Sequence, residues 1–319
     1  MYKFFNKNLI VQTIIMVALI IYSIFIIFGN ITMEVPSGVD PLYQFLYSLL
    51  YNQTGVLRAV VILSLIIQVV MLQLIFKKNN FLDSASLFPS IWFLAYLIAG
   101  NFLQEISPLF FVNFIIVFLL YLNINYESAS IKNSVFLSGI CVGISFFIDF
   151  TSFLLLFFVI FSLVINRFSK GKDIFISIFG LLIPIIYFIS YGFFTNNLLL
   201  IIPSFQDFHF FGITSFFSDF KLVDLLFLIL LVIILFYATV SLKISFSNKL
   251  IVMRKRLITI NILTIVLFLA FMLSGNHYPH LLLYMLIPVS IYFPLMQDNK
   301  KRWIFNDVIL LLLLIILWL

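Results

Sequence analysis

The sequence has few charged residues and a single cysteine. Only 9% of its 319 residues are Asp, Glu, Lys or Arg, whereas 64% are hydrophobic and the mean hydropathy is +1.23. Because soluble globular domains carry about 25% charged residues, this composition excludes one. The lone cysteine, Cys141, excludes an intramolecular disulfide and a cysteine metal cluster.

Sequence features typical of transporters and channels are also missing. No internal repeat is visible, and no pair of helices interrupted by Gly or Pro occupies matching positions in two halves. Inverted-repeat transporters commonly show such symmetry. No apolar run carries ionisable residues through its middle, as a proton relay or an ion channel requires. These absences weaken a transporter interpretation, although the topology alone is compatible with one.

Long apolar runs dominate what is present. Runs of about 20 residues match the roughly 30 Å of membrane hydrocarbon, so we predict an all-α polytopic transmembrane helix bundle. The eleven predicted spans are 9–29, 57–76, 86–104, 108–124, 134–149, 151–166, 173–194, 223–243, 256–274, 280–297 and 303–319. The fifth and sixth meet so closely at Asp149 that a re-entrant hairpin is an alternative.

The basic residues predict the orientation of these spans. With the N-terminus in the cytoplasm, every Lys and Arg except Arg58 and Lys221 falls on the cytoplasmic side, as membrane proteins prefer. The net charge of +6 is therefore a topology signal, and we expect no nucleic-acid partner. We expect a membrane module over residues 1–195, with a first outer loop at 30–56. An aromatic outer loop and the C-terminal spans follow over residues 196–319.

Carboxylates and histidines follow the opposite distribution. On the outer side lie Glu34, Asp40, Glu105, Asp149, Asp207, Asp219, Asp224, His209, His277 and His280. Such groups with few neighbouring cations indicate metal or proton chemistry on that face. Selection against Lys and Arg in outer loops accounts for the same pattern, so both explanations stay open.

The first outer loop carries two carboxylates and then a helical pattern. Asp40 precedes Pro41, and apolar residues at helical spacing continue to Leu50. Because Asp at the N-cap and Pro at the first position favour a helix start, we predict an interfacial helix that begins at Pro41. Asp40 is either its cap or a catalytic base, and both roles can coexist. Glu34 has no capping role and is either a base or a solvated loop acid.

Four segments together resemble the GT-C superfamily of integral-membrane glycosyltransferases. They are the first span with its acidic loop and interfacial helix, the turn Glu105-Ile106-Ser107-Pro108, residues 134–165, and Asn276-His277-Tyr278-Pro279-His280 before a late span. The resemblance implies sugar transfer from a polyprenyl-phosphate donor on the outer face. The chain is also similar to small membrane proteins of Bacteroidota, which implies the inner membrane of a bacterium.

The resemblance implies roles for particular residues. Asp40 or Glu34 would be the base that deprotonates the acceptor, and Glu105 would assist it or bind Mg²⁺ or Mn²⁺. The implied substrate-binding residues are Arg58, Glu105, Asp149, His277, Tyr278 and His280. Asp149 and His277 stand where many members of the superfamily carry Lys or Arg, so cations for a donor phosphate are scarce.

Each binding candidate also has a structural explanation. Glu105 precedes Pro108 and can cap the next helix, where negative charge is favoured. Arg58 can extend its side chain to the membrane interface, and Asp149 can be an interfacial turn acid. His277 and His280 have a spacing that permits metal binding, but no third ligand accompanies them.

Two functions are compatible with this pattern. The first is a GT-C-like transferase, whose partners would be membrane lipid and a polyprenyl-phosphate sugar. The second is a non-catalytic membrane subunit or scaffold of an envelope complex, whose partners would be other membrane proteins. The enzyme requires Glu34 or Asp40 close to Glu105 or a histidine, beside a groove for a lipid chain.

Overall fold

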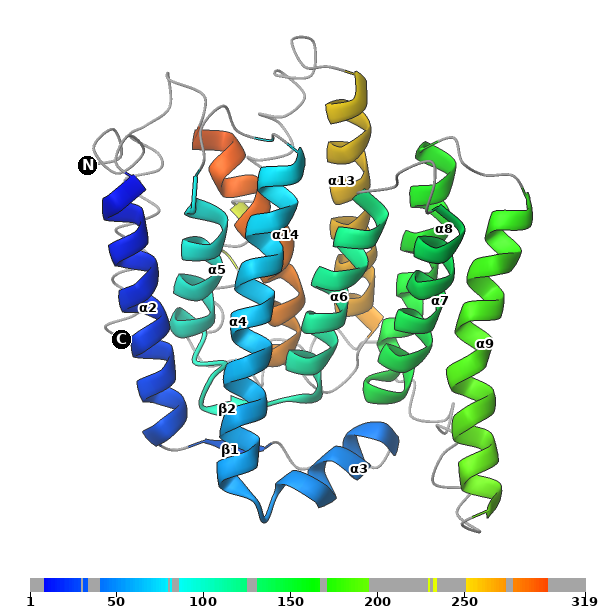
Figure 1. Cartoon of the computed structure of the whole chain (residues 1–319), viewed down its shortest axis with the longest axis horizontal. Helices are drawn as coiled ribbons and strands as arrows, with labels where there is room; N and C mark the ends of the chain where they lie inside the picture. Colours follow the sequence, from blue (N-terminus) through cyan, green and yellow to red (C-terminus); the bar gives the residue numbers. More distant parts are fainter. Residues whose placement is uncertain are drawn as a thin grey trace.

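The computed structural model is a bundle of helices that lie side by side (Figure 1). It describes residues 9–29, 31–33, 41–79, 81, 86–124, 131–166, 171–194, 229, 232–233, 251–273 and 278–297. The predicted span 223–243 falls almost entirely outside these residues, and 303–319 falls outside them completely.

The described part of the chain is all-α apart from one short strand pair. Its helices are α2 (Leu9–Gly29), α3 (Pro41–Leu50), α4 (Thr54–Asn79), α5 (Phe88–Ala99), α6 (Pro108–Ile124), α7 (Ile131–Ile148), the 3-10 helix η1 (Phe150–Leu154), α8 (Leu155–Ile165), α9 (Gly171–Phe194), α13 (Ile251–Leu273) and α14 (Tyr278–Gln297). The predicted helix start at Pro41 is confirmed.

Four of the described helices are long and apolar enough to cross a membrane: α2, α4, α7 and α9. The outer helices α2 and α9 keep many large apolar side chains exposed, among them Phe25 and Phe179. Such a surface is unfavourable in water but ordinary in lipid, where the surroundings are as apolar as the side chains. The protein is therefore an all-α membrane protein.

Helix α5 is shorter than its predicted span. We predicted helix over 86–104, but the helix ends at Ala99 and a turn follows over 100–104. Asn101 has a φ of 54°, in the left-handed region that Asn tolerates better than most residues and that no α-helix can contain. Apolar composition alone did not predict that the helix ends at Ala99.

Small residues allow α7 and α9 to pack backbone to backbone. A Cβ added at Gly139 would lie 2.1 Å from the carbonyl oxygen of Ser177, and one at Gly180 would lie 2.3 Å from that of Phe136. Gly143 is one turn further along α7, and a Cβ there would lie 2.8 Å from the carbonyl oxygen of Leu181. Close approach at small residues is a common way to associate helices in lipid, where no hydrophobic force draws them together.

A buried polar cluster joins the neighbouring helices. Asn123 on α6 donates from Nδ2 to the hydroxyl of Ser138 on α7 at 3.2 Å, and its Oδ1 accepts from Ser162 on α8 at 2.5 Å. All three side chains are inaccessible to solvent. Hydrogen bonds between helices supplement packing in a membrane bundle.

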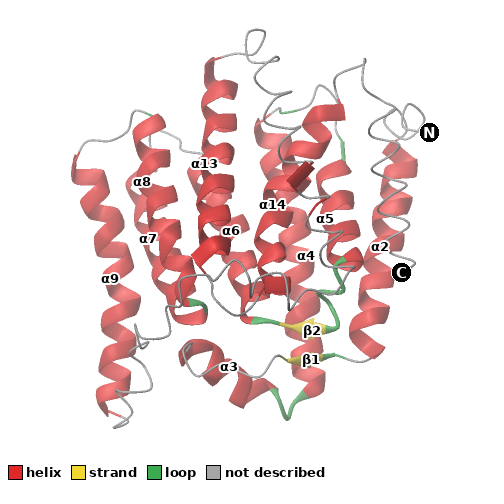
Figure 2. Cartoon of the chain, turned by 180° about the vertical axis from the view of Figure 1, so that it is seen from behind, coloured by secondary structure: helices red, strands yellow, loops and turns green. Residues whose placement is uncertain are grey.

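One end of the bundle carries α3 and the strand pair, and we call it the α3 end (Figures 1 and 2). Strand β1 (Thr32–Met33) pairs in parallel with β2 (Glu105–Ile106), with Thr32 opposite Glu105. The buried hydroxyl of Tyr43 on α3 donates to the carbonyl oxygen of Ile106 at 3.0 Å. The first loop is thus tied on both sides of residues 34–40 to the turn that precedes α6.

The α7–α9 contact yields a stability prediction. Gly139→Ala places a methyl group against backbone rather than against a movable side chain, so we expect a loss of about 1–3 kcal/mol and a lower melting temperature in detergent. Gly171→Ala is the matched control, because a Cβ at that position of α9 meets nothing within 4 Å. Equal melting temperatures for the two variants would contradict the proposed close packing.

Candidate functional site

The α3 end collects several of the predicted site residues. Arg58 belongs to the first turns of α4 and Glu105 to β2, and Asp149 is the residue between α7 and η1. Helix α14 also begins at this end, because its Tyr284 contacts Asp149. Segments far apart in sequence therefore bring these candidates to the same end of the bundle (Figure 2).

Three of the predicted site residues lie outside the described part of the chain: Glu34, Asp40 and His277. Tyr278 and His280 belong to the first turn of α14, but their side chains are also outside it. The predicted proximity of Glu34 or Asp40 to Glu105 or a histidine therefore stays a prediction.

Glu105 is accessible at the α3 end. Its backbone pairs with Thr32 in the β1–β2 ladder, and its side chain is exposed. The amide of Thr32 donates to the carbonyl oxygen of Gln104 at 3.0 Å, which fixes the register beside it. Glu105 therefore lies next to the segment that enters the first loop, with its carboxylate available to solvent or to a ligand.

Asp149 accepts hydrogen bonds from hydroxyl groups on two neighbouring elements. Its Oδ2 accepts a hydrogen bond from Tyr284 on α14 at 2.7 Å and one from Thr151 in η1 at 2.5 Å. Asp149 occupies the N-cap position of η1, yet its side chain does not cap that helix. A half-buried carboxylate in a membrane protein requires such partners, because an unpaired one is costly. The contact also attaches the α7–η1 turn to α14.

Sequence reasoning missed Tyr284 and Thr151. Tyr284 lies inside the apolar run LLLYML, and its side chain is 1% exposed. A buried tyrosine usually finds a partner for its hydroxyl, and this rule is the available signal. The sequence did not identify Asp149 as that partner, because Asp149 and Tyr284 are separated by 135 positions.

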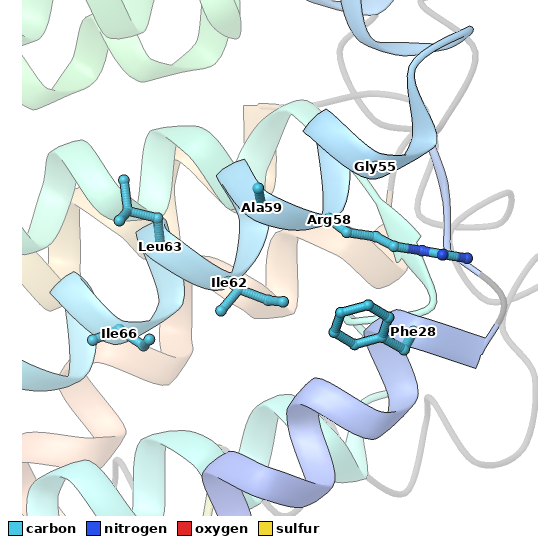
Figure 3. Close-up of a pocket in the computed structure, with 7 residues that line it drawn as sticks. All are labelled: Phe28, Gly55, Arg58, Ala59, Ile62, Leu63 and Ile66. Atoms are coloured by element: carbon cyan, nitrogen blue, oxygen red, sulfur yellow. The ribbon is translucent and has the colours of Figure 1, made fainter.

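Arg58 lies beside an apolar groove between α2 and α4 (Figure 3). Its guanidinium carbon is 5.6 Å from the centre of the Phe28 ring, a cation–π distance. The groove has a volume of about 410 Å³ and is lined by Phe28, Gly55, Arg58, Ala59, Ile62, Leu63 and Ile66. Neither Glu105 nor Asp149 lines it, so the groove is separate from the carboxylates described above.

Tyrosines recur every four residues along α3 and into the turn that follows it. Tyr43 points into the structure and bonds to Ile106, whereas the rings of Tyr47 and Tyr51 stack with centroids 4.8 Å apart. Desolvation, together with Tyr51, raises the pKa of the Tyr47 hydroxyl above its usual value. Tyrosines at a membrane surface place the ring in the interface and the hydroxyl in water.

The described residues do not form a metal site. No three His, Cys, Asp or Glu side chains among them are grouped as a metal ion would require. Metal binding by Glu105 would therefore need ligands from the remaining residues, such as Glu34 or Asp40, and it stays a prediction. No step below depends on a metal ion.

The Asp149–Tyr284 hydrogen bond yields a second prediction. Tyr284→Phe leaves Asp149 with one hydroxyl partner fewer, so we expect a loss of roughly 1–3 kcal/mol and a lower melting temperature in detergent. Tyr187→Phe on the exposed face of α9 is the control and should leave the melting temperature unchanged. If Tyr284→Phe and the wild type have the same melting temperature, this hydrogen bond does not hold α14 to the start of η1.

Comparison of the chain with protein-family models, with curated proteins and with solved structures found no match. The arrangement of its own residues at the α3 end is therefore the basis for assigning a function.

Proposed function

We propose that the protein is a GT-C-like glycosyltransferase that uses a polyprenyl-phosphate-linked sugar on the outer face of a bacterial inner membrane. The observation that supports this best is the attachment of the first loop. The β1–β2 pair and the Tyr43–Ile106 hydrogen bond hold both sides of residues 34–40 at the end of the bundle that carries Glu105 and Asp149. The superfamily resemblance implies an acidic first loop near outer-face residues such as these.

The distribution of basic residues supports an outward-facing α3 end. Lys77 and Lys78 occupy the last turn of α4, whereas Lys132 and Lys172 lie at the starts of α7 and α9. These helix ends are opposite the α3 end (Figure 1). Among the described Lys and Arg residues, Arg58 alone belongs to the α3 end. Cytoplasmic ends attract Lys and Arg, so the topology with eleven spans and a cytoplasmic N-terminus remains our proposal.

The reaction would be a direct displacement at the anomeric carbon. Asp40 or Glu34 takes the proton of an acceptor hydroxyl, and the acceptor oxygen bonds to the anomeric carbon. The bond between that carbon and the phosphate oxygen breaks, and its electron pair leaves with the polyprenyl phosphate. Positive charge near that phosphate would stabilise the leaving group, and protonated His277 or His280 would supply it.

The environment of Asp149 favours a second candidate function. Its carboxylate is engaged by Tyr284 and Thr151, which is a structural arrangement that needs no substrate. A protein that keeps this architecture but has no catalytic activity would be a membrane subunit of an envelope complex. Its binding surface would then be the α3 end, and its partners would be other membrane proteins.

Transfer assays distinguish the two functions. Purified protein in nanodiscs is given undecaprenyl-phosphate-linked hexoses or pentoses together with a bacterial envelope extract as the source of acceptor hydroxyls, and release of undecaprenyl phosphate is measured. If either acid is the base, the double variant Glu34→Gln/Asp40→Asn should lose activity about 10²- to 10⁴-fold, and the single variants identify which acid acts. Asp173→Asn is the matched control, since this carboxylate lies in the first turn of α9 at the opposite end.

Two results would contradict the enzyme. If the double variant releases undecaprenyl phosphate as fast as the wild type, neither Glu34 nor Asp40 is the base. Absence of release by folded wild-type protein with every donor favours the non-catalytic subunit, and co-purification of a membrane partner through the α3 end would then identify the complex.

A further inference from the structure

Among the described residues, Arg58 lacks the partners that a partly buried guanidinium normally has. No carboxylate in the described part of the chain forms an ion pair with it, and its buried Nε has no hydrogen-bond acceptor. The Phe28 ring offers a face to the cation but accepts no conventional hydrogen bond. The outward-pointing end of this half-buried guanidinium carries further N–H donors, and an anionic acceptor that bonds to them would be stabilising (Figure 3).

The surface beside Arg58 is apolar and elongated. From Arg58 to Ile66 the groove follows α4 for eight residues, or about 12 Å along a helix. Arg58 is at the end nearer the helix start, and its guanidinium points past the Phe28 ring, away from Ile66 (Figure 3). One cation at the membrane surface and an apolar channel toward the membrane interior match the two parts of a lipid molecule.

The position of the groove favours a bulk membrane lipid over the sugar donor. Helix α2 lies on the opposite side of the bundle from α7, α8 and α9 (Figures 1 and 2). The groove walls are exposed on the surface of the molecule at Phe28 of α2 and at Leu63 and Ile66 of α4, so surrounding lipid can enter the groove laterally. Asp149, which lies between α7 and η1, is not part of its lining.

We propose that this groove binds one anionic phospholipid from the leaflet at the α3 end. Its phosphate accepts hydrogen bonds from the Arg58 guanidinium, whose planar fork suits two phosphate oxygens. One acyl chain lies along Ala59, Ile62 and Ile66. Zwitterionic lipids carry their own ammonium group and gain less from Arg58, so the site selects for net negative charge. This binding does not depend on the proposed transferase activity.

Thermal unfolding and native mass spectrometry test the site directly. Delipidated protein in a neutral detergent is titrated with dioleoylphosphatidylglycerol or with dioleoylphosphatidylcholine. We expect the first to raise the melting temperature more and to remain bound as a single copy at low lipid excess. Arg58→Ala should weaken this binding about tenfold, as expected for the loss of one charge-assisted hydrogen-bonded pair. Lys77→Ala removes a cation from the other end of the same helix and should preserve the effect.

A second variant separates chain binding from general charge attraction. Ala59→Phe keeps Arg58 but fills the groove, so it should also weaken binding of the phosphatidylglycerol. Glycerol 3-phosphate, which has no chain, should produce no shift. Equal shifts from both lipids, or equal losses in Arg58→Ala and Lys77→Ala, would overturn the proposal. A shift with undecaprenyl phosphate and none with phosphatidylglycerol would overturn it as well and would assign the groove to the donor.

Discussion

The absence of water from membrane hydrocarbon is the constraint on which this structure depends. Each backbone amide and carbonyl must find a partner inside the protein, and a helix meets this need within one segment. The non-helical pairing seen among the described residues, between β1 and β2, accordingly lies at an end of the bundle. Two carboxylates among the candidate site residues, Glu105 and Asp149, lie at that end as well.

Association of the helices then follows from close packing and internal polar contacts. Lipid is as apolar as leucine, so burial of apolar surface does little to bring helices together. The protein instead brings the α7 and α9 backbones into contact at Gly139 and Gly180, and it joins α6, α7 and α8 through Asn123. Asp149 and Tyr284 follow the same rule, which is why their contact is compatible with both candidate functions.

Features that depend on local sequence were predictable, and those that depend on distant pairing were not. Apolar runs gave the all-α membrane class, and Asp40-Pro41 gave the start of α3. The early end of α5 was missed, because composition does not report the backbone angle of Asn101. Asp149 was placed in a tight turn, as a substrate-binding residue or an interfacial turn acid. Its partner Tyr284 is far along the chain, and no sequence rule selects one buried hydroxyl among many. The roles of Glu34 and Asp40 remain predictions.

The attachment of the first loop has a consequence for the order of assembly. Thr32 and Gln104, whose hydrogen bond fixes the strand register, are 72 residues apart in the chain. Synthesis from the N-terminus therefore produces β1 well before its partner, and α4 and α5 must be in place before the two can meet. Contacts of such sequence separation form slowly, because the chain loses the entropy of closing the loop before the contact contributes any stabilising free energy. Strand β1 is consequently among the later parts of the α3 end to reach its final position, because it stays unpaired until the chain beyond α5 has been synthesised.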